Sequence, residues 1–241
     1  MAKRFKVKTK LNAFDKFMIG LFKLFKGKHR IINLNEDDIP IKSIWIGNHC
    51  NSGGPINYSM YFSDRAMFWA AHQMCGKWNE RWNYAYHTFY RQKLYYGKFK
   101  SWILATLLAF IAPLAYGVPG VIPVYYDLRV IDTFKKSLMA LEGGQTVFVF
   151  PEESEEGYLQ EIRKLNSGFI ELSKIYYKKY GVDLPIYTLH LNKKPKKIVI
   201  GKPFYYRELA KQYSDEEICV YFTDYMNSLK TLQIIPEQAS A

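Results

Sequence analysis

Cysteine is scarce in this sequence of 241 residues, which contains three, none of them in a C-x-x-C pair. So few scattered thiols exclude a disulfide framework and a zinc site built from paired cysteines. His72, His87 and His190 have no metal-ligand spacing to cysteines or carboxylates, so we predict no metal and no cofactor. The low cysteine content favours a reducing, cytoplasmic setting.

Acidic residues are also few, with 22 Asp and Glu against 34 Lys and Arg, which gives a formal charge of +12. This excess favours an anionic counterpart, either nucleic acid, anionic lipid, or an acidic substrate or carrier. No linker-like tract interrupts the chain, which is 49% hydrophobic, so we predict a single domain over residues 1–241. The basic start "MAKRFKVKTK" lacks a following signal-peptide core, and export is not expected.

Residues 12–27 have the pattern of a basic amphipathic helix, capped by Asn12 and ended by Gly27. We predict that this helix lies in a membrane surface, with lysines at anionic head groups and aromatic side chains at the acyl boundary. The alternative is a helix packed on the core of the domain. The residues predicted to contact the membrane are Phe14, Phe17, Leu21 and Phe22, together with Trp102 from a second apolar segment.

That second segment, residues 101–118, carries no charge but is interrupted by Pro113. It is near the lower length limit for a spanning helix, and the proline favours a buried or half-immersed helix instead. The segment before it is dense in aromatic and basic residues, which suits either single-stranded nucleic acid or the surface of a membrane. No nucleic-acid motif accompanies it, so we favour the membrane and expect no nucleic acid partner.

The second half of the chain alternates apolar β-type runs with segments of helical spacing, the last of which is preceded by the capping-box pair Ser214 and Glu217. Such alternation predicts an α/β fold with a mainly parallel central sheet flanked by helices. In such sheets, sites collect beyond the carboxyl ends of the strands. His49 follows the run "IWI" and Glu152 follows "TVFV", so both are expected at such ends.

Four short motifs occur in a fixed order along the chain. They are Asn48-His49, the run "GVIPV" at 120–124, "FPE" at 150–152, and "LPI" at 184–186. In this order and at these separations they resemble the motifs of the glycerolipid acyltransferase family, of the lysophosphatidic acid acyltransferase type. The resemblance extends from the first strand to "IGKPF", most of the chain, and it implies the fold of that family.

The resemblance also implies an activity. In this family the histidine removes a proton from an acceptor hydroxyl, which attacks the thioester carbon of acyl-CoA or acyl carrier protein. His49 would be the general base, while Asn48, Phe150, Pro151, Glu152 and Arg129 would contribute to substrate binding. The predicted function is therefore transfer of a fatty acyl group to a hydroxyl of a lysophospholipid-like or other lipid acceptor. The protein would be peripheral on the inner face of the membrane.

Departures from the family pattern leave alternatives open. Gly54 replaces the aspartate that would orient His49, Tyr126 stands where an arginine would be, and Glu153 and Ser154 replace a Gly-Thr pair. Another group can orient His49, the candidates being Asp64, Asp127, Glu152, Glu153 or a backbone carbonyl. Otherwise the chemistry is lost and an acyltransferase-fold protein binds lipid or membrane, or His49 is only structural. Arg129, Arg163 and Lys164 are candidates for the missing positive charge.

Overall fold

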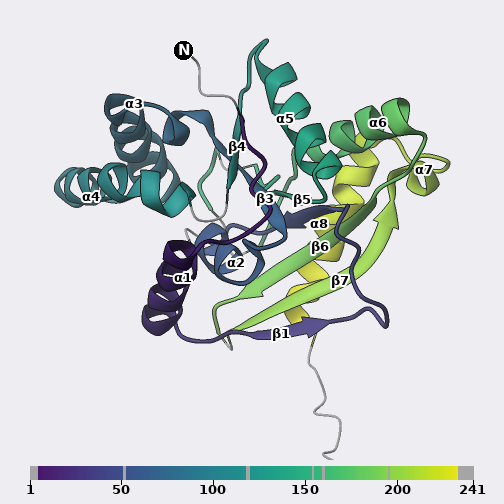
Figure 1. The fold of residues 1–241 in the computed structure, drawn as a ribbon, viewed down its shortest axis with the longest axis horizontal. Coiled ribbons are helices and arrows are strands. Elements are labelled where there is room, and N and C mark those ends of the chain that lie inside the picture. Colours follow the sequence, from purple (N-terminus) through teal and green to yellow (C-terminus); the bar gives the residue numbers. More distant parts are fainter. Residues whose placement is uncertain are drawn as a thin grey trace, which may run out of the picture.

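The computed structural model describes residues 5–50, 53–117, 120–153, 155–158, 161–194 and 196–232. Its centre is a seven-stranded sheet in the order β1-β7-β6-β2-β5-β3-β4 (Figure 1). Every neighbouring pair is parallel except β6 and β7, so the predicted mainly parallel α/β sheet is confirmed. The strands are β1 (Arg30–Asn33), β2 (Ile44–Gly47), β3 (Ala66–Ala71), β4 (Val121–Val124), β5 (Thr146–Val149), β6 (Pro185–Asn192) and β7 (Lys197–Tyr205).

Helices flank this sheet (Figure 1). The α-helices are α1 (Ala13–Lys26), α2 (Gly54–Phe62), α3 (Trp78–Asn83), α4 (Lys98–Gly117), α5 (Val130–Glu142), α6 (Gly168–Tyr180), α7 (Tyr206–Leu209) and α8 (Asp215–Thr231). A short 3₁₀ helix, η1 (His72–Cys75), follows β3, and a π-helix, η2 (Tyr84–Lys93), joins α3 to the segment before α4.

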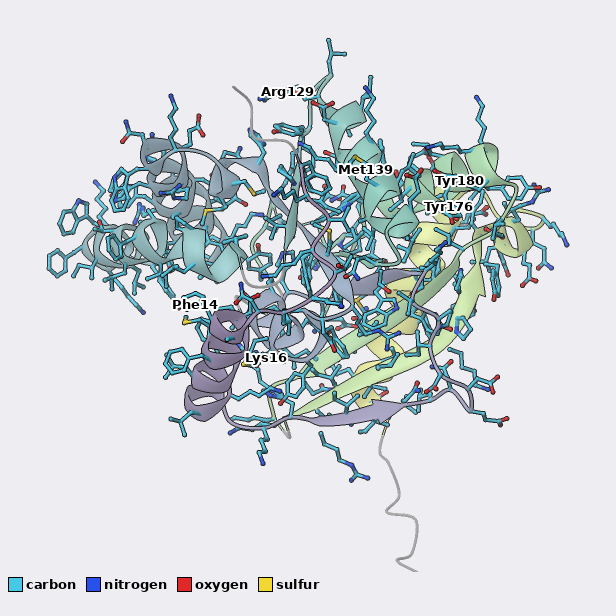
Figure 2. The ribbon with its side chains drawn as sticks, in the orientation of Figure 1. Phe14, Lys16, Arg129, Met139, Tyr176 and Tyr180 are labelled. Atoms are coloured by element: carbon cyan, nitrogen blue, oxygen red, sulfur yellow. The ribbon has the colours of Figure 1, made fainter. Side chains whose placement is uncertain are left out.

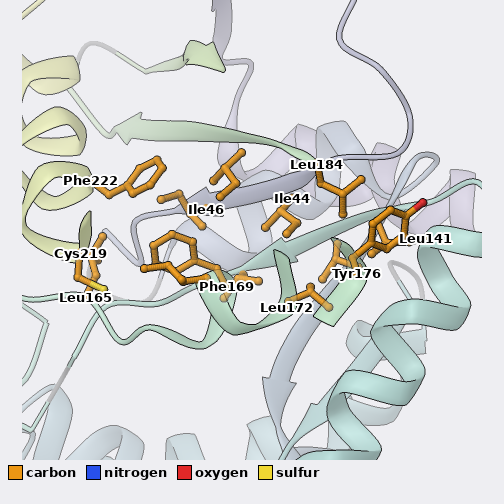
Figure 3. Packing of buried hydrophobic residues seen from close by; sticks show 14 of the residues in the cluster. Ile44, Ile46, Leu141, Leu165, Phe169, Leu172, Tyr176, Leu184, Cys219 and Phe222 are labelled. Atoms are coloured by element: carbon orange, nitrogen blue, oxygen red, sulfur yellow. The ribbon is translucent and has the colours of Figure 1, made fainter. Parts of the chain in front are cut away.

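Strand β2 shows how the sequence builds both faces of the core. Successive side chains of a strand point to opposite faces, and all three apolar residues of "IWI" are fully buried. Ile44 and Ile46 belong to the cluster that includes Phe169 of α6 and Phe222 of α8 (Figure 3). Trp45 belongs to a second cluster, with α2 on the other face. The strand is therefore enclosed on both sides, as expected of a central parallel strand.

Several boundaries differ from the sequence prediction. Strands β1 and β3 were not predicted. The sequence from 161 to 181, "EIRKLNSGFIELSKIYYKKYG", has the spacing of a helix throughout, but the helix α6 begins only at Gly168. The residues before α6 remain extended because Leu165 forms a bridge with Glu152 and Asn166 N donates to Pro151 O at 2.7 Å. Pairing with the residues after β5 thus keeps this segment out of the helix, although its sequence has helical spacing. The capping box at Ser214 and Glu217, in contrast, is present at the start of α8.

Helices α1 and α4 both lie at the left of Figure 1, and both expose large apolar side chains. Helix α1 is capped by Asn12 and exposes a stripe that includes Phe17, which is 65% exposed, whereas Phe22 is half-buried. Phe14 lies on the first turn of this helix (Figure 2). Among the residues of α1 whose side chains are described, the large apolar ones that are exposed are Phe14, Phe17, Leu21 and Leu24.

Helix α4 buries small residues and exposes large ones. Its buried side chains are Ser101, Ala105, Ala109 and Ala112, and its exposed apolar ones include Phe99, Trp102, Leu107, Phe110 and Leu114. Pro113 lies inside this helix, in agreement with a helix through that segment. No helix within the described ranges combines the length and apolar character needed to span a bilayer.

A single lysine links the two helices. Lys8 Nζ donates to Gly117 O at the end of α4 (2.7 Å) and pairs with Asp15 in the first turn of α1 (2.7 Å). The start of α1 and the end of α4 are therefore close in space, although about 100 residues separate them in the chain.

Candidate active site

Strand register brings His49 and Glu152 together. Strands β2 and β5 are parallel neighbours in which Ile46 pairs with Val149, and each of the two polar residues lies three positions further along its chain. His49 N donates to Glu152 Oε2 at 3.0 Å, and His49 Nδ1 lies 3.4 Å from the same oxygen. Of the carboxylates proposed to orient His49, Glu152 is the one in contact with it.

The two contacts with Glu152 differ in kind. The backbone N–H contact is a hydrogen bond, whereas Nδ1 is within ion-pair distance but is not aligned for a hydrogen bond and has no other partner among the described residues. We therefore treat the Nδ1 contact as electrostatic. Catalytic hydrogen bonds are often long in the absence of substrate and shorten when it binds.

The imidazole of His49 lies between aromatic rings. It stacks on Tyr158 with 4.3 Å between ring centroids and is tilted against Phe150 at 5.1 Å, so its side chain is 17% exposed. Burial lowers the pKa of His49 below its ordinary value, Glu152 acts in the opposite direction, and Lys93 lowers it further. A neutral imidazole at pH 7 is the form that accepts a proton.

Asn48 has its polar atoms engaged by the protein. Its Oδ1 accepts from Tyr58 Oη and from Leu191 N, both at 2.8 Å, and its Nδ2 donates to Leu191 O at 3.1 Å. These bonds hold the end of β2 against β6 and α2. Asn48 therefore positions the residue that follows it, and its predicted contact with substrate stays a prediction.

The turn after His49 leaves no room for a side chain at position 54, where the motif that the sequence resembles has an aspartate. Gly54 N donates to His49 O at 2.7 Å, and a Cβ at this position would lie 2.3 Å from Asn48 O. Pro55 is in the first turn of α2, a position that favours proline. The turn at Gly54 thus closes on the backbone of Asn48 and His49.

The cations suggested by the sequence are already paired. Arg129 binds Asp127 (2.6 Å), Lys164 binds Glu153 (2.8 Å), and the third candidate, Arg163, binds Glu156 (2.7 Å). Arg129 also lies at the outer edge of the molecule, after strand β4 (Figure 2). Since β5 and β3 intervene between β2 and β4, their axes are about 14 Å apart. The structure does not bring Arg129 into contact with His49.

A cation that the sequence interpretation missed, Lys93, reaches the site from the end of η2. Its Nζ lies 5.2 Å from the centre of the Tyr158 ring, and its backbone O accepts from Tyr158 N at 3.3 Å. No carboxylate of the described residues is within ion-pair distance of this ammonium. Only the basic and aromatic composition of the segment could have signalled its presence.

Pro151 and Phe150 lie between β5 and Glu152, where Phe150 packs against both His49 and Tyr58. Ser154, one of the departures from the family pattern, lies outside the described residues. Within those residues, no three His, Cys, Asp or Glu side chains gather in a way that could hold a metal ion.

The chain matches no family model, and a search of curated proteins finds none with significant similarity.

Proposed function

We propose that this protein transfers a fatty acyl group from an acyl thioester to a hydroxyl of a lipid acceptor at a membrane surface. The observation that carries the proposal is the contact of His49 with Glu152 at the carboxyl ends of two adjacent parallel strands. A histidine and a buried carboxylate in this arrangement are a general base and the group that orients it.

The reaction follows from the geometry of the pair. Glu152 faces Nδ1 and favours the tautomer in which Nδ1 carries the proton, so Nε2 is the basic nitrogen. Nε2 accepts the proton of the acceptor hydroxyl while its oxygen attacks the thioester carbonyl carbon. The C–S bond then breaks, and the leaving thiolate takes the proton from the imidazolium. Glu152 stabilises the imidazolium between these two steps.

The donor we propose is acyl-CoA or acyl carrier protein. Both carriers are anionic, and the chain has a formal charge of +12. Opposite net charges increase the rate at which two partners associate, most strongly at low salt. This argument supports an acidic carrier in general and does not choose between the two.

Access of a lipid acceptor is supported by the exposed faces of α1 and α4. Both faces present large apolar side chains, among them Phe17 and Phe110, and Lys8 connects the two helices. Exposed apolar area of this extent, next to lysines, is typical of proteins that lie on a bilayer. We therefore propose peripheral membrane association, on the cytoplasmic face, through these helices.

The test is acyl transfer by the full chain in the presence of liposomes. Purified protein is incubated with an acyl-CoA and a lysophospholipid, and the acylated product is measured by mass spectrometry. His49→Ala is expected to abolish product, while His72→Ala, which changes a half-buried histidine on Tyr125, is the matched control. Full activity of His49→Ala would exclude this mechanism.

A non-catalytic lipid-binding protein is the second candidate. The observation that favours it is the turn at Gly54, which has closed over the position of the family's orienting aspartate. This candidate predicts liposome binding without product for both the wild-type protein and His49→Ala, under conditions in which a known acyltransferase yields product.

A further inference from the structure

Cations gather at the end of the sheet where β6 turns into β7. Residues 192–197 have the sequence "NKKPKK", which contains four lysines and no acidic residue. We call these lysines, Lys193, Lys194, Lys196 and Lys197, the basic hairpin. The first three are exposed, whereas Lys197 is half-buried and donates through Nζ to Leu232 O at 2.6 Å. None of the four has a carboxylate of the described residues within ion-pair distance.

Two more cations, Lys28 and Arg30, lie beside the basic hairpin. Arg30 is opposite Lys197 in the register of β1 and β7, and Arg30 N donates to Lys196 O at 2.9 Å. Both Lys28 and Arg30 are exposed, and within the described ranges neither forms an ion pair. The acidic residues at 36–38 follow the other end of β1. Positive charge without contacting carboxylates is therefore concentrated at one end of the sheet.

The basic hairpin lies between the turn after His49 and the end of α1. Strand β6 is parallel to β2, so the connection that follows β6 is at the same end of the sheet as His49. Lys193 reaches the turn, since a Cβ at Gly53 would lie 3.1 Å from its Cε. Lys196 reaches the end of α1, since a Cβ at Gly27 would lie 2.8 Å from its Nζ. The cations are therefore continuous with the helix that we propose to contact a membrane.

The clustering of these cations has an energetic cost. Like charges at such short separations repel one another, and the repulsion opposes the compact state unless anions collect there. The field also acts on neighbouring groups, because burial and the charge of Lys196 lower the pKa of His29. Clusters of four to eight basic residues on or beside an amphipathic helix are typical of proteins that bind anionic lipids.

An anionic bilayer fits this surface better than a nucleic acid does. The last turn of α1 exposes Leu24, which is 78% exposed and lies three residues before Gly27, the glycine that Lys196 adjoins. Apolar and cationic side chains are therefore neighbours here, and a bilayer offers both hydrocarbon and anionic head groups. Single-stranded nucleic acid is bound by aromatic rings placed among cations, and residues 192–197 contain no aromatic residue.

We propose that the basic hairpin, Lys28 and Arg30 form a docking surface for anionic bilayers, in addition to the apolar faces of α1 and α4. Because Lys193 adjoins the turn after His49, contact through this surface holds the His49 end of the sheet against the membrane. The inference rests on the membrane association in the proposed function, which it deepens by naming the charge of the lipid and the end of the sheet that faces it. It does not depend on catalysis.

The experiment is sedimentation of the full chain with vesicles. One kind of vesicle contains only phosphatidylcholine, and the other contains phosphatidylcholine and phosphatidylglycerol in equal amounts. The wild-type protein is expected to bind the anionic vesicles at least about tenfold more tightly, because each basic residue near anionic lipid contributes about fivefold. Salt should reduce this preference. Hydrogen exchange should slow around Lys28 and Lys194 on anionic vesicles and stay unchanged in α7, which follows the end of β7 opposite the start of β6.

Three exposed lysines of this surface are replaced together in the test variant, which carries Lys28→Gln, Lys194→Gln and Lys196→Gln. It is expected to bind anionic vesicles at least about tenfold more weakly than the wild-type protein, with unchanged binding to phosphatidylcholine. The matched control removes as many exposed lysines from α5, from α6 and from the segment after α7, and carries Lys135→Gln, Lys178→Gln and Lys211→Gln. It lowers the net charge equally and should change either affinity less than about threefold.

Thermal unfolding of each variant shows whether the fold is kept. Lys196 has a positive φ of 59°, so a replacement there is the one most sensitive to the backbone. If the triple variant is destabilised, Lys28→Gln with Lys194→Gln is the second variant, and it is expected to weaken binding to anionic vesicles about fivefold or more.

Four results would overturn the inference. They are equal affinity of the wild-type protein for the two kinds of vesicle, an unchanged preference in the lysine variants, an equal loss in the control variant, or lysine-dependent binding of a single-stranded oligonucleotide more tightly than of anionic vesicles. Binding that requires Phe17 and Phe110 without any preference for anionic lipid refutes this surface but not the proposed membrane association. Lysine-dependent binding to anionic vesicles without any acylated product refutes the enzyme but not this surface.

Discussion

Replacing Glu152 with glutamine tests the group that orients His49. Glutamine keeps the length of the side chain, and its amide oxygen can still accept from His49 N, which lies 3.0 Å from Oε2. It removes the negative charge that lies 3.4 Å from Nδ1. The substitution therefore separates the charge of Glu152 from its shape.

The magnitude follows from that distance. Two unit charges 3.4 Å apart interact with about 5 kcal/mol at an effective dielectric constant of 20. About 1.4 kcal/mol corresponds to a factor of ten in rate. If all of this attraction to the imidazolium were lost, the rate of acyl transfer would fall by at most several thousand-fold. We expect the kcat of acyl transfer in Glu152→Gln to fall between about 100-fold and that limit, with a smaller change in KM.

The matched control is Glu153→Gln, which removes the neighbouring charge of the same loop, where Glu153 pairs with Lys164. The pKa of His49, measured by NMR, should fall further in Glu152→Gln, because Glu152 raises it in the wild-type protein. A kcat within fivefold of wild type, or an equal loss in Glu153→Gln, would refute the role assigned to Glu152. A merely structural effect would lower thermal stability without this change in pKa.

Three further predictions concern the turn, the core and the surface. Gly54→Asp should lower the free energy of unfolding by about 2 kcal/mol or more rather than restore a family-type site, because its Cβ would lie 2.3 Å from a backbone oxygen; a gain of activity without loss of stability in denaturant titration would contradict this. Burial lowers the pKa of His190 in the folded state to about 4, from an ordinary value of 6.5. Below pH 6.5 the unfolded state therefore binds more protons than the folded state, and the free energy of unfolding decreases as the pH is lowered, by about 2 kcal/mol at pH 5. In urea titrations, His190→Gln should lose about 2 kcal/mol less unfolding free energy between pH 7 and pH 5 than the wild-type protein does. The same loss in both proteins would contradict this prediction. Phe17→Ser with Phe110→Ser should weaken sedimentation with anionic liposomes at least tenfold while leaving the melting temperature unchanged, because both side chains are exposed; unchanged sedimentation would exclude these faces as the membrane contact.

Much of the fold was predictable from local patterns. The apolar runs at β2 and β5 are mostly β-branched or aromatic, and His49 and Glu152 follow them within three residues, so both strands and the positions of these two residues after them could be predicted. The capping box at Ser214 predicted the start of α8 correctly. Strand β1, with the sequence "RIIN", could not be predicted, because it lies mostly exposed at the edge of the sheet and depends on pairing with β7.

The partner of His49 was decided by tertiary structure. Four carboxylates were equal candidates in the sequence, and the choice of Glu152 depends on β5 lying next to β2 with Ile46 opposite Val149. Asp127 follows the outermost strand, where it binds Arg129 instead.

The position of Lys93 was also decided by tertiary structure, because this residue meets Tyr158 through a π-helix and a corner, and only the basic and aromatic composition of the segment gave any signal of it. Helix and strand formation depend on neighbours a few residues away, which the sequence displays directly. The order and register of strands depend on the packing of segments about 100 residues apart, and these contacts decide which charges surround the imidazole.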